Sequence, residues 1–99
     1  MNKDLQTISQ ILSKYLDPRE NQAFVFGSRP TGTAVPYSDY DIGVKGAPIS
    51  AETYFNLEQE FEDSDLPFLV QIVDFNDVSN RFAEVASQET IPINMSHNA

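Results

Sequence analysis

Two short apolar runs, each joined to residues that carry chemistry, constrain the fold of this chain more than any other feature. The first run, residues 24–26, ends at Gly27-Ser28, and the second run, residues 42–44, begins directly after Asp39-Tyr40-Asp41. Short apolar runs bounded by glycine are typical of buried strands. The sequence therefore predicts one strand that ends in a glycine turn and another that begins at a pair of carboxylates.

Apolar periodicity and capping residues predict the other elements. A helical repeat ends at Asp17-Pro18, because the residue before a proline is driven out of the helical region, and Ser50 is suited to cap a second helix. Three helices are expected. The first covers residues 4–16, the second runs from the cap at Ser50 to Phe61, and the third begins at Asn76 or Asp77. The expected strands cover residues 23–26 and 40–44, a central strand over 68–75, and an edge strand over 91–93.

This order of elements predicts an α/β fold in which a small mixed β-sheet is flanked by helices. No repeat or low-complexity linker divides the chain. We therefore expect one domain over residues 1–94, followed by a loose tail over residues 95–99.

Charge and composition narrow the class of partner. Fifteen acidic and six basic residues give a net charge of −9, which repels a nucleic-acid backbone and favours a basic protein partner. The chain has no cysteine, so a metal ion would be held by oxygen ligands or by the single histidine, His97. No apolar stretch approaches the roughly 18 residues of a membrane span, and the first residues lack the layout of a signal peptide, so we expect a cytoplasmic protein.

The carboxylate pair is the strongest indication of chemistry. If residues 39–44 are extended, the side chains of Asp39 and Asp41 share one face of the strand. Two carboxylates in a small space repel each other unless a cation lies between them. Magnesium suits this position, because it commonly binds one or two carboxylates together with substrate phosphates.

The glycine turn before the carboxylates is suited to phosphate. Gly27 and Ser28 offer backbone amides that can approach a phosphate closely, and Arg29 adds a charged donor. We also assign Ser38, directly before Asp39, to nucleotide binding. A Gly-Ser pair alone is usually a plain turn, and an isolated Asp-x-Asp is usually a solvated strand edge. Their combination with two buried strands favours a phosphoryl-transfer site.

This segment resembles the DNA polymerase β-type nucleotidyltransferase superfamily, whose signature is Gly-Ser, ten intervening residues and Asp-x-Asp. Here ten residues, 29–38, separate Gly27-Ser28 from Asp39-Tyr40-Asp41. The resemblance implies a polymerase β-like fold over most of the chain and two magnesium ions held by Asp39, Asp41 and a third carboxylate. Asp74, which ends the apolar run 70–73, is the expected third carboxylate, while Asp77 is the expected helix cap.

Within the superfamily, the chain is most similar to the minimal nucleotidyltransferase antitoxins, which are encoded beside HEPN-domain RNase toxins. That similarity implies transfer of AMP from ATP to a tyrosine of the toxin, and a hetero-oligomer with it. Two alternatives stay open: an antitoxin that masks the toxin by binding alone, and a nucleotidyltransferase for a small molecule such as an aminoglycoside. The small-molecule alternative is disfavoured by length, because such enzymes generally add a second domain that holds the acceptor.

Overall fold

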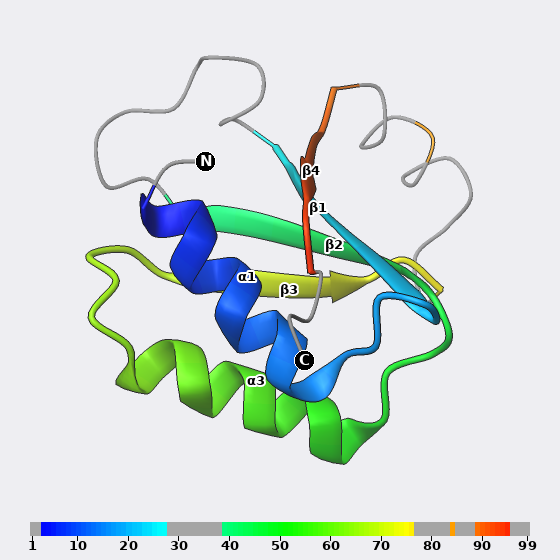
Figure 1. Cartoon of the computed structure of the whole chain (residues 1–99), viewed down its shortest axis with the longest axis horizontal. Helices are drawn as coiled ribbons and strands as arrows, with labels where there is room; N and C mark the ends of the chain where they lie inside the picture. Colours follow the sequence, from blue (N-terminus) through cyan, green and yellow to red (C-terminus); the bar gives the residue numbers. More distant parts are fainter. Residues whose placement is uncertain (1–2, 28–38, 77–83, 85–88, 96–99) are drawn as a thin grey trace.

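The computed structural model of this chain describes residues 3–27, 39–76, 84 and 89–95, and these parts contain two helices and four strands (Figure 1). In chain order the elements are α1 (Lys3–Tyr15), β1 (Asn21–Phe26), β2 (Tyr40–Gly46), α3 (Ala51–Asp63), β3 (Val70–Asp74) and β4 (Ile91–Ile93). Neither helix is long and apolar enough to cross a membrane, within the part of the chain that is described.

The four strands form one mixed sheet in the order β3-β2-β1-β4. Strand β1 is antiparallel to both β2 and β4, and β2 is parallel to β3. Because β1 and β2 are antiparallel, the end of β1 lies beside the start of β2, and Phe26 is the register partner of Asp41. The predicted mixed sheet is confirmed, and its pairing brings the glycine turn next to the carboxylate pair.

Both described helices pack on one face of the sheet (Figure 1). The fully buried side chains at this interface are Ile8, Leu12, Val25, Ile42, Val44 and Leu57. Alternation along the strands explains the strand members Val25, Ile42 and Val44, because every second residue of a strand points to the same face. The helices also contact each other through Glu60, which accepts hydrogen bonds from Lys14 and Tyr15.

The opposite face of the sheet carries a compact aromatic cluster made of Phe24, Phe26 and Phe75. The rings of Phe24 and Phe75 meet edge to face with centroids 4.9 Å apart. Gly43 lies beneath them, and a Cβ atom at this position would come within 2.6 Å of both rings. Glycine at position 43 therefore makes room for the aromatic cluster directly beside the site strand.

The predicted helix cap is confirmed. The Ser50 hydroxyl accepts a hydrogen bond from the backbone N–H of Thr53 at 3.1 Å, as the first turn of a helix requires. The helix continues to Asp63, two residues beyond the predicted end, and there the backbone N–H and hydroxyl of Ser64 donate to the Phe61 carbonyl.

Two predictions about the strands need correction. Strand β3 lies at an edge of the described sheet rather than at its centre, because it pairs only with β2 there. It also begins at Val70 rather than at residue 68, and Leu69 is 68% exposed. An apolar run does not by itself distinguish a central strand from an edge strand whose flanking residues face solvent.

At the C-terminal end the edge strand over residues 91–93 is confirmed, whereas Met95, which was expected to begin a loose tail, belongs to the core. Met95 is buried in the main core, and its carbonyl accepts a hydrogen bond from the Ser13 hydroxyl. The Ser9 hydroxyl donates to the carbonyl of Asn94. Residues 96–99 and the expected third helix, apart from Asn76 and Glu84, lie outside the described residues.

Candidate active site

Gly27 closes β1 in a conformation that only glycine adopts readily. Its φ angle is +82°, in the left-handed region that side chains with a Cβ atom disfavour. A Cβ atom at this position would lie 2.5 Å from the Oδ2 atom of Asp41. The turn and the carboxylate are therefore fitted to each other at the same end of the sheet.

The carboxylate of Asp41 is affected by its burial and by the neighbouring Asp39. Partial burial raises the pKa of Asp41, and the nearby negative charge of Asp39 raises it further. Both effects disfavour the ionised form. A cation at this position would relieve the repulsion, so the pair fits the donor set that magnesium prefers.

The strand register does not place Asp74 with this pair. In the parallel pairing of β2 and β3, Asp41 lies opposite Gln71, and Asp74 lies three positions further along, opposite Val44. Side chains alternate between the faces of a sheet. Asp74 shares the helix-covered face with the buried Val44, whereas Asp41 points to the other face. The grouping of Asp74 with the two site carboxylates is therefore corrected, and the described residues contain no group of three acidic, histidine or cysteine side chains placed to hold a metal ion.

Asp74 instead organises the backbone around it. Its Oδ2 atom accepts a hydrogen bond from the N–H of Ile49 at 3.0 Å, and its Oδ1 atom accepts from the N–H and the side-chain amide of Asn76. Burial alone raises the pKa of Asp74, but these hydrogen bonds outweigh burial and lower it below its ordinary value. The ionised carboxylate thus ties the connection before α3 to the end of β3.

We expect Asp74→Asn to lower the stability of the fold rather than the affinity for metal. Hydrogen bonds to a charged group contribute about 1.5–3 kcal/mol each, so the variant should lose on the order of 1–3 kcal/mol at pH 7. Because the pKa of Asp74 is lowered in the fold, its contribution is present above the unfolded-state pKa of about 3.9 and is lost as the pH falls through the folded-state value. The difference between variant and wild type should therefore shrink toward pH 2.

Denaturant unfolding of both proteins at pH 7 and at the lowest pH that both tolerate measures this effect. The matched control is Asp63→Asn, which changes an exposed acidic residue at the end of α3. Loss of magnesium-dependent ATP binding by Asp74→Asn, in protein that is still folded, would return Asp74 to the metal site.

Gln71 is the residue that the sequence reasoning missed. It is the register partner of Asp41 on the neighbouring strand, and the parallel pairing directs both side chains to the same face. A signal for it was present in the chain. Ile42 and Ile72 are both buried on the helix side, so the residue before each of them faces the other way.

Of the residues predicted to contact phosphate, the structure describes only Gly27. Gly27 lies at the turn beside Asp41, where its backbone approaches the carboxylate. Ser28, Arg29 and Ser38 lie outside the described residues. Their assignment to nucleotide binding stays a prediction from the sequence.

One relative is similar to this chain in sequence, and two solved structures are similar to it in fold. The chain is 29% identical over 85 residues to the probable protein adenylyltransferase MntA of Haemophilus influenzae, which covers 85% of this chain and 73% of the relative. A toxin–antitoxin crystal structure with AMP-PNP has a chain that matches with a TM-score of 0.74 and 22% identity, over 95% of this chain and 75% of that one. A complex of a tri-AMPylated Shewanella oneidensis HEPN toxin with its MNT antitoxin has a chain that matches with a TM-score of 0.60 and 21% identity, over 93% and 73% of the two chains.

These structural likenesses confirm the predicted fold class. The family model described as "Polymerase beta, Nucleotidyltransferase" matches residues 6–96, which is nearly the whole chain and includes both carboxylates and the glycine turn. This chain belongs to the polymerase β nucleotidyltransferase family.

Proposed function

We propose that this chain transfers AMP from ATP to a tyrosine of a HEPN-type toxin and thereby acts as the toxin's antitoxin. The observation that carries the proposal is the carboxylate pair of Asp39 and Asp41 beside the Gly27 turn. Membership of a nucleotidyltransferase family supports the reaction class. The relative described as a probable protein adenylyltransferase, and the AMPylated HEPN toxin found with an antitoxin of similar fold, support a protein acceptor.

We propose that Asp39 and Asp41 hold the magnesium that such a transfer uses. Bound magnesium would neutralise negative charge on the phosphates during the displacement. Two carboxylates suffice for this ion when substrate phosphates complete its coordination. Asp74 is not part of this proposal, since its carboxylate is engaged with Ile49 and Asn76 on the other face of the sheet.

In the proposed reaction the acceptor hydroxyl oxygen forms a new bond to the α-phosphorus of ATP. The bond from that phosphorus to the bridging oxygen breaks, and pyrophosphate leaves with the electron pair. Gln71 carries a neutral amide, so it can orient the acceptor by hydrogen bonding but cannot take up the hydroxyl proton. We assign proton uptake to the carboxylate pair, and the role of Gly27 is to let backbone amides approach the phosphates closely.

A catalyst and a masking antitoxin differ in stoichiometry. When ATP and magnesium are present, we expect each molecule of this chain to inactivate many molecules of the HEPN toxin, because a catalyst is released after each transfer. A masking protein protects only one toxin per copy. The measurement is RNase activity at toxin-to-antitoxin ratios from 1 to about 100, with intact-mass analysis of the toxin for added AMP.

Without ATP, the excess toxin should stay active. Protection that requires equal amounts, with or without ATP and with no mass increase, would establish masking instead. Efficient transfer of AMP to an aminoglycoside, with none to the toxin, would establish the small-molecule alternative.

A further inference from the structure

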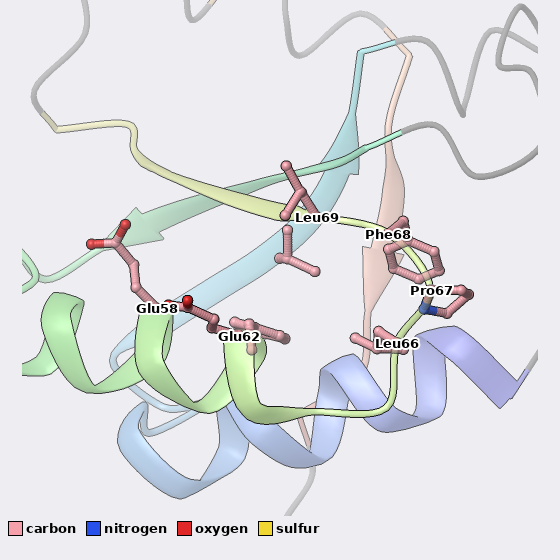
Figure 2. A pocket seen from close by; sticks show the side chains of 8 residues that line it. Glu58, Glu62, Leu66, Pro67, Phe68 and Leu69 are labelled. Carbon is pink, nitrogen blue, oxygen red and sulfur yellow. The ribbon is translucent and has the colours of Figure 1, made fainter.

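The seam between α3 and β3 is hollowed and largely apolar. One groove, with a volume of about 580 Å³, lies between the end of α3 and the segment that leads into β3 (Figure 2). Phe61, Leu66 and Phe68 line its interior, and Glu58 and Glu62 of α3 line its side. A second groove of about 480 Å³ shares Glu58 and continues along the same two elements. We call the two grooves together the α3–β3 strip.

Large apolar side chains are exposed along this strip. Leu69 is 68% exposed in the first groove, and Phe55 is 60% exposed in the second. Alternation explains Leu69, because its neighbours Phe68 and Val70 pack against the core and leave it pointing outward. Two such side chains on adjoining grooves mark an interaction surface more strongly than one isolated apolar residue does.

One end of the strip adjoins the start of β2, which carries the carboxylate pair. The backbone N–H of Tyr40 donates to the carbonyl of Leu69 at 2.9 Å, so Leu69 is bonded to the residue that separates Asp39 from Asp41. A macromolecule bound along the strip would therefore extend to the carboxylate pair. A surface with this position is suited to hold the acceptor rather than the nucleotide.

Charge decides which kind of molecule fits. Glu58 and Glu62 form no ion pair with any residue that the structure describes. An acidic border repels the phosphates of ATP or of a nucleic acid and attracts lysine and arginine. A protein segment with apolar side chains between basic ones is complementary to both features.

We infer that the α3–β3 strip docks a basic, apolar segment of the toxin that carries the acceptor tyrosine. This inference rests on the proposed function for the identity of the partner. Glu58 and Glu62 supply the attraction, Leu69 and Phe55 supply the apolar contact, and the carboxylate pair lies beyond Leu69 where the acceptor hydroxyl enters.

The test compares binding of two ligands by one variant, Glu58→Lys, Glu62→Lys, Leu69→Ser. All three residues are exposed, so the variant is expected to fold. Titration calorimetry with the HEPN toxin, in the absence of ATP, should show a Kd at least about 10-fold weaker than that of wild type, since loss of one well-placed contact already costs that much. The affinity for magnesium and ATP should stay unchanged.

A charge-matched control, Glu20→Lys, Asp63→Lys, makes the same kind of change at exposed positions that do not line the grooves. It should bind the toxin nearly as wild type does. Equal weakening by both variants would mean that net charge alone drives binding, and would overturn the docking site. Wild-type toxin affinity in the groove variant would overturn it too.

Two further measurements separate toxin docking from catalysis and from self-association. If wild type binds the toxin but transfers no AMP, the proposed function fails while the docking measurement still stands. If wild type is a dimer by sedimentation and Leu69→Ser, Phe55→Ser makes it a monomer without changing the toxin Kd, the strip joins two copies of this chain and the inference is wrong.

Discussion

Replacing Asp39 and Asp41 together by asparagine is expected to abolish AMP transfer to the toxin and magnesium-dependent binding of ATP. The substitution keeps the shape of both side chains and removes the two charges that would hold the cation. Metal coordination of reacting phosphates contributes several kcal/mol, and about 4 kcal/mol corresponds to a 1000-fold loss of rate. Single-turnover transfer with radiolabelled ATP and saturating toxin measures this loss.

The same variant should be no less stable than wild type when metal is absent. The pKa of Asp41 is raised by burial and by Asp39, so ionisation of Asp41 at neutral pH opposes folding. Asparagine removes that repulsion. Magnesium with ATP should then raise the Tm of wild type, through preferential binding to the folded state, and leave the Tm of the variant unchanged.

The control variant Glu20→Gln, Asp63→Asn removes two carboxylate charges at exposed positions away from the turn. It should transfer AMP at the wild-type rate. If the Asp39→Asn, Asp41→Asn variant keeps magnesium-dependent ATP affinity, the metal is held elsewhere. If it loses affinity but the control loses it equally, the effect belongs to net charge and not to the site.

The elements that hold the site could be predicted from the sequence because each depends on local pattern. The run before Gly27 and the run after Asp41 are buried strands for the reason that the sequence indicates, their apolar side chains. Ser50 caps α3 through a contact only three residues long. Local signals of this kind do not depend on how the elements are paired.

The position of the third carboxylate depended on strand pairing, and there the structure separates Asp74 from Asp39 and Asp41. The parallel register of β2 and β3 decides that Gln71, and not Asp74, lies beside Asp41. A shift of one residue reverses the face of every side chain on a strand. A carboxylate at the end of an apolar run therefore indicates a site residue only when its face is known, and Asp74 lies on the helix side.

The α3–β3 strip could not be predicted from the sequence either. The run over residues 68–75 gives no sign that Leu69 is exposed, because the sequence alone does not show that β3 lies at an edge. In the sequence, the acidic residues of α3 are typical of an ordinary solvated helix face. Only the packing of α3 against β3 places two of them, Glu58 and Glu62, beside an apolar groove.

Gly27→Val is expected to reduce AMP transfer by at least about 100-fold, through the carboxylate rather than through a lost contact. A β-branched residue at a φ of +82° is strained, and a left-handed conformation costs an ordinary residue about 1–2 kcal/mol. The first side-chain atom would also lie 2.5 Å from the Oδ2 atom of Asp41. The carboxylate must move, and a displacement of about 1 Å at a reacting centre can cost 100-fold in rate.

Gly27→Ala adds the same Cβ atom without branching, so it should reduce transfer less than valine does. Gly46→Ala is the matched control, since Gly46 also has a positive φ, of +107°, but lies at the other end of β2. There a Cβ atom would meet the carbonyl oxygen of Glu20, so the control loses stability without touching the carboxylates.

The measured transfer rates are divided by the folded fraction from circular dichroism. After that correction Gly46→Ala should match wild type while both Gly27 variants stay slow. Equal corrected rates in all four proteins would show that the glycine turn only supports the fold and that the phosphates bind elsewhere.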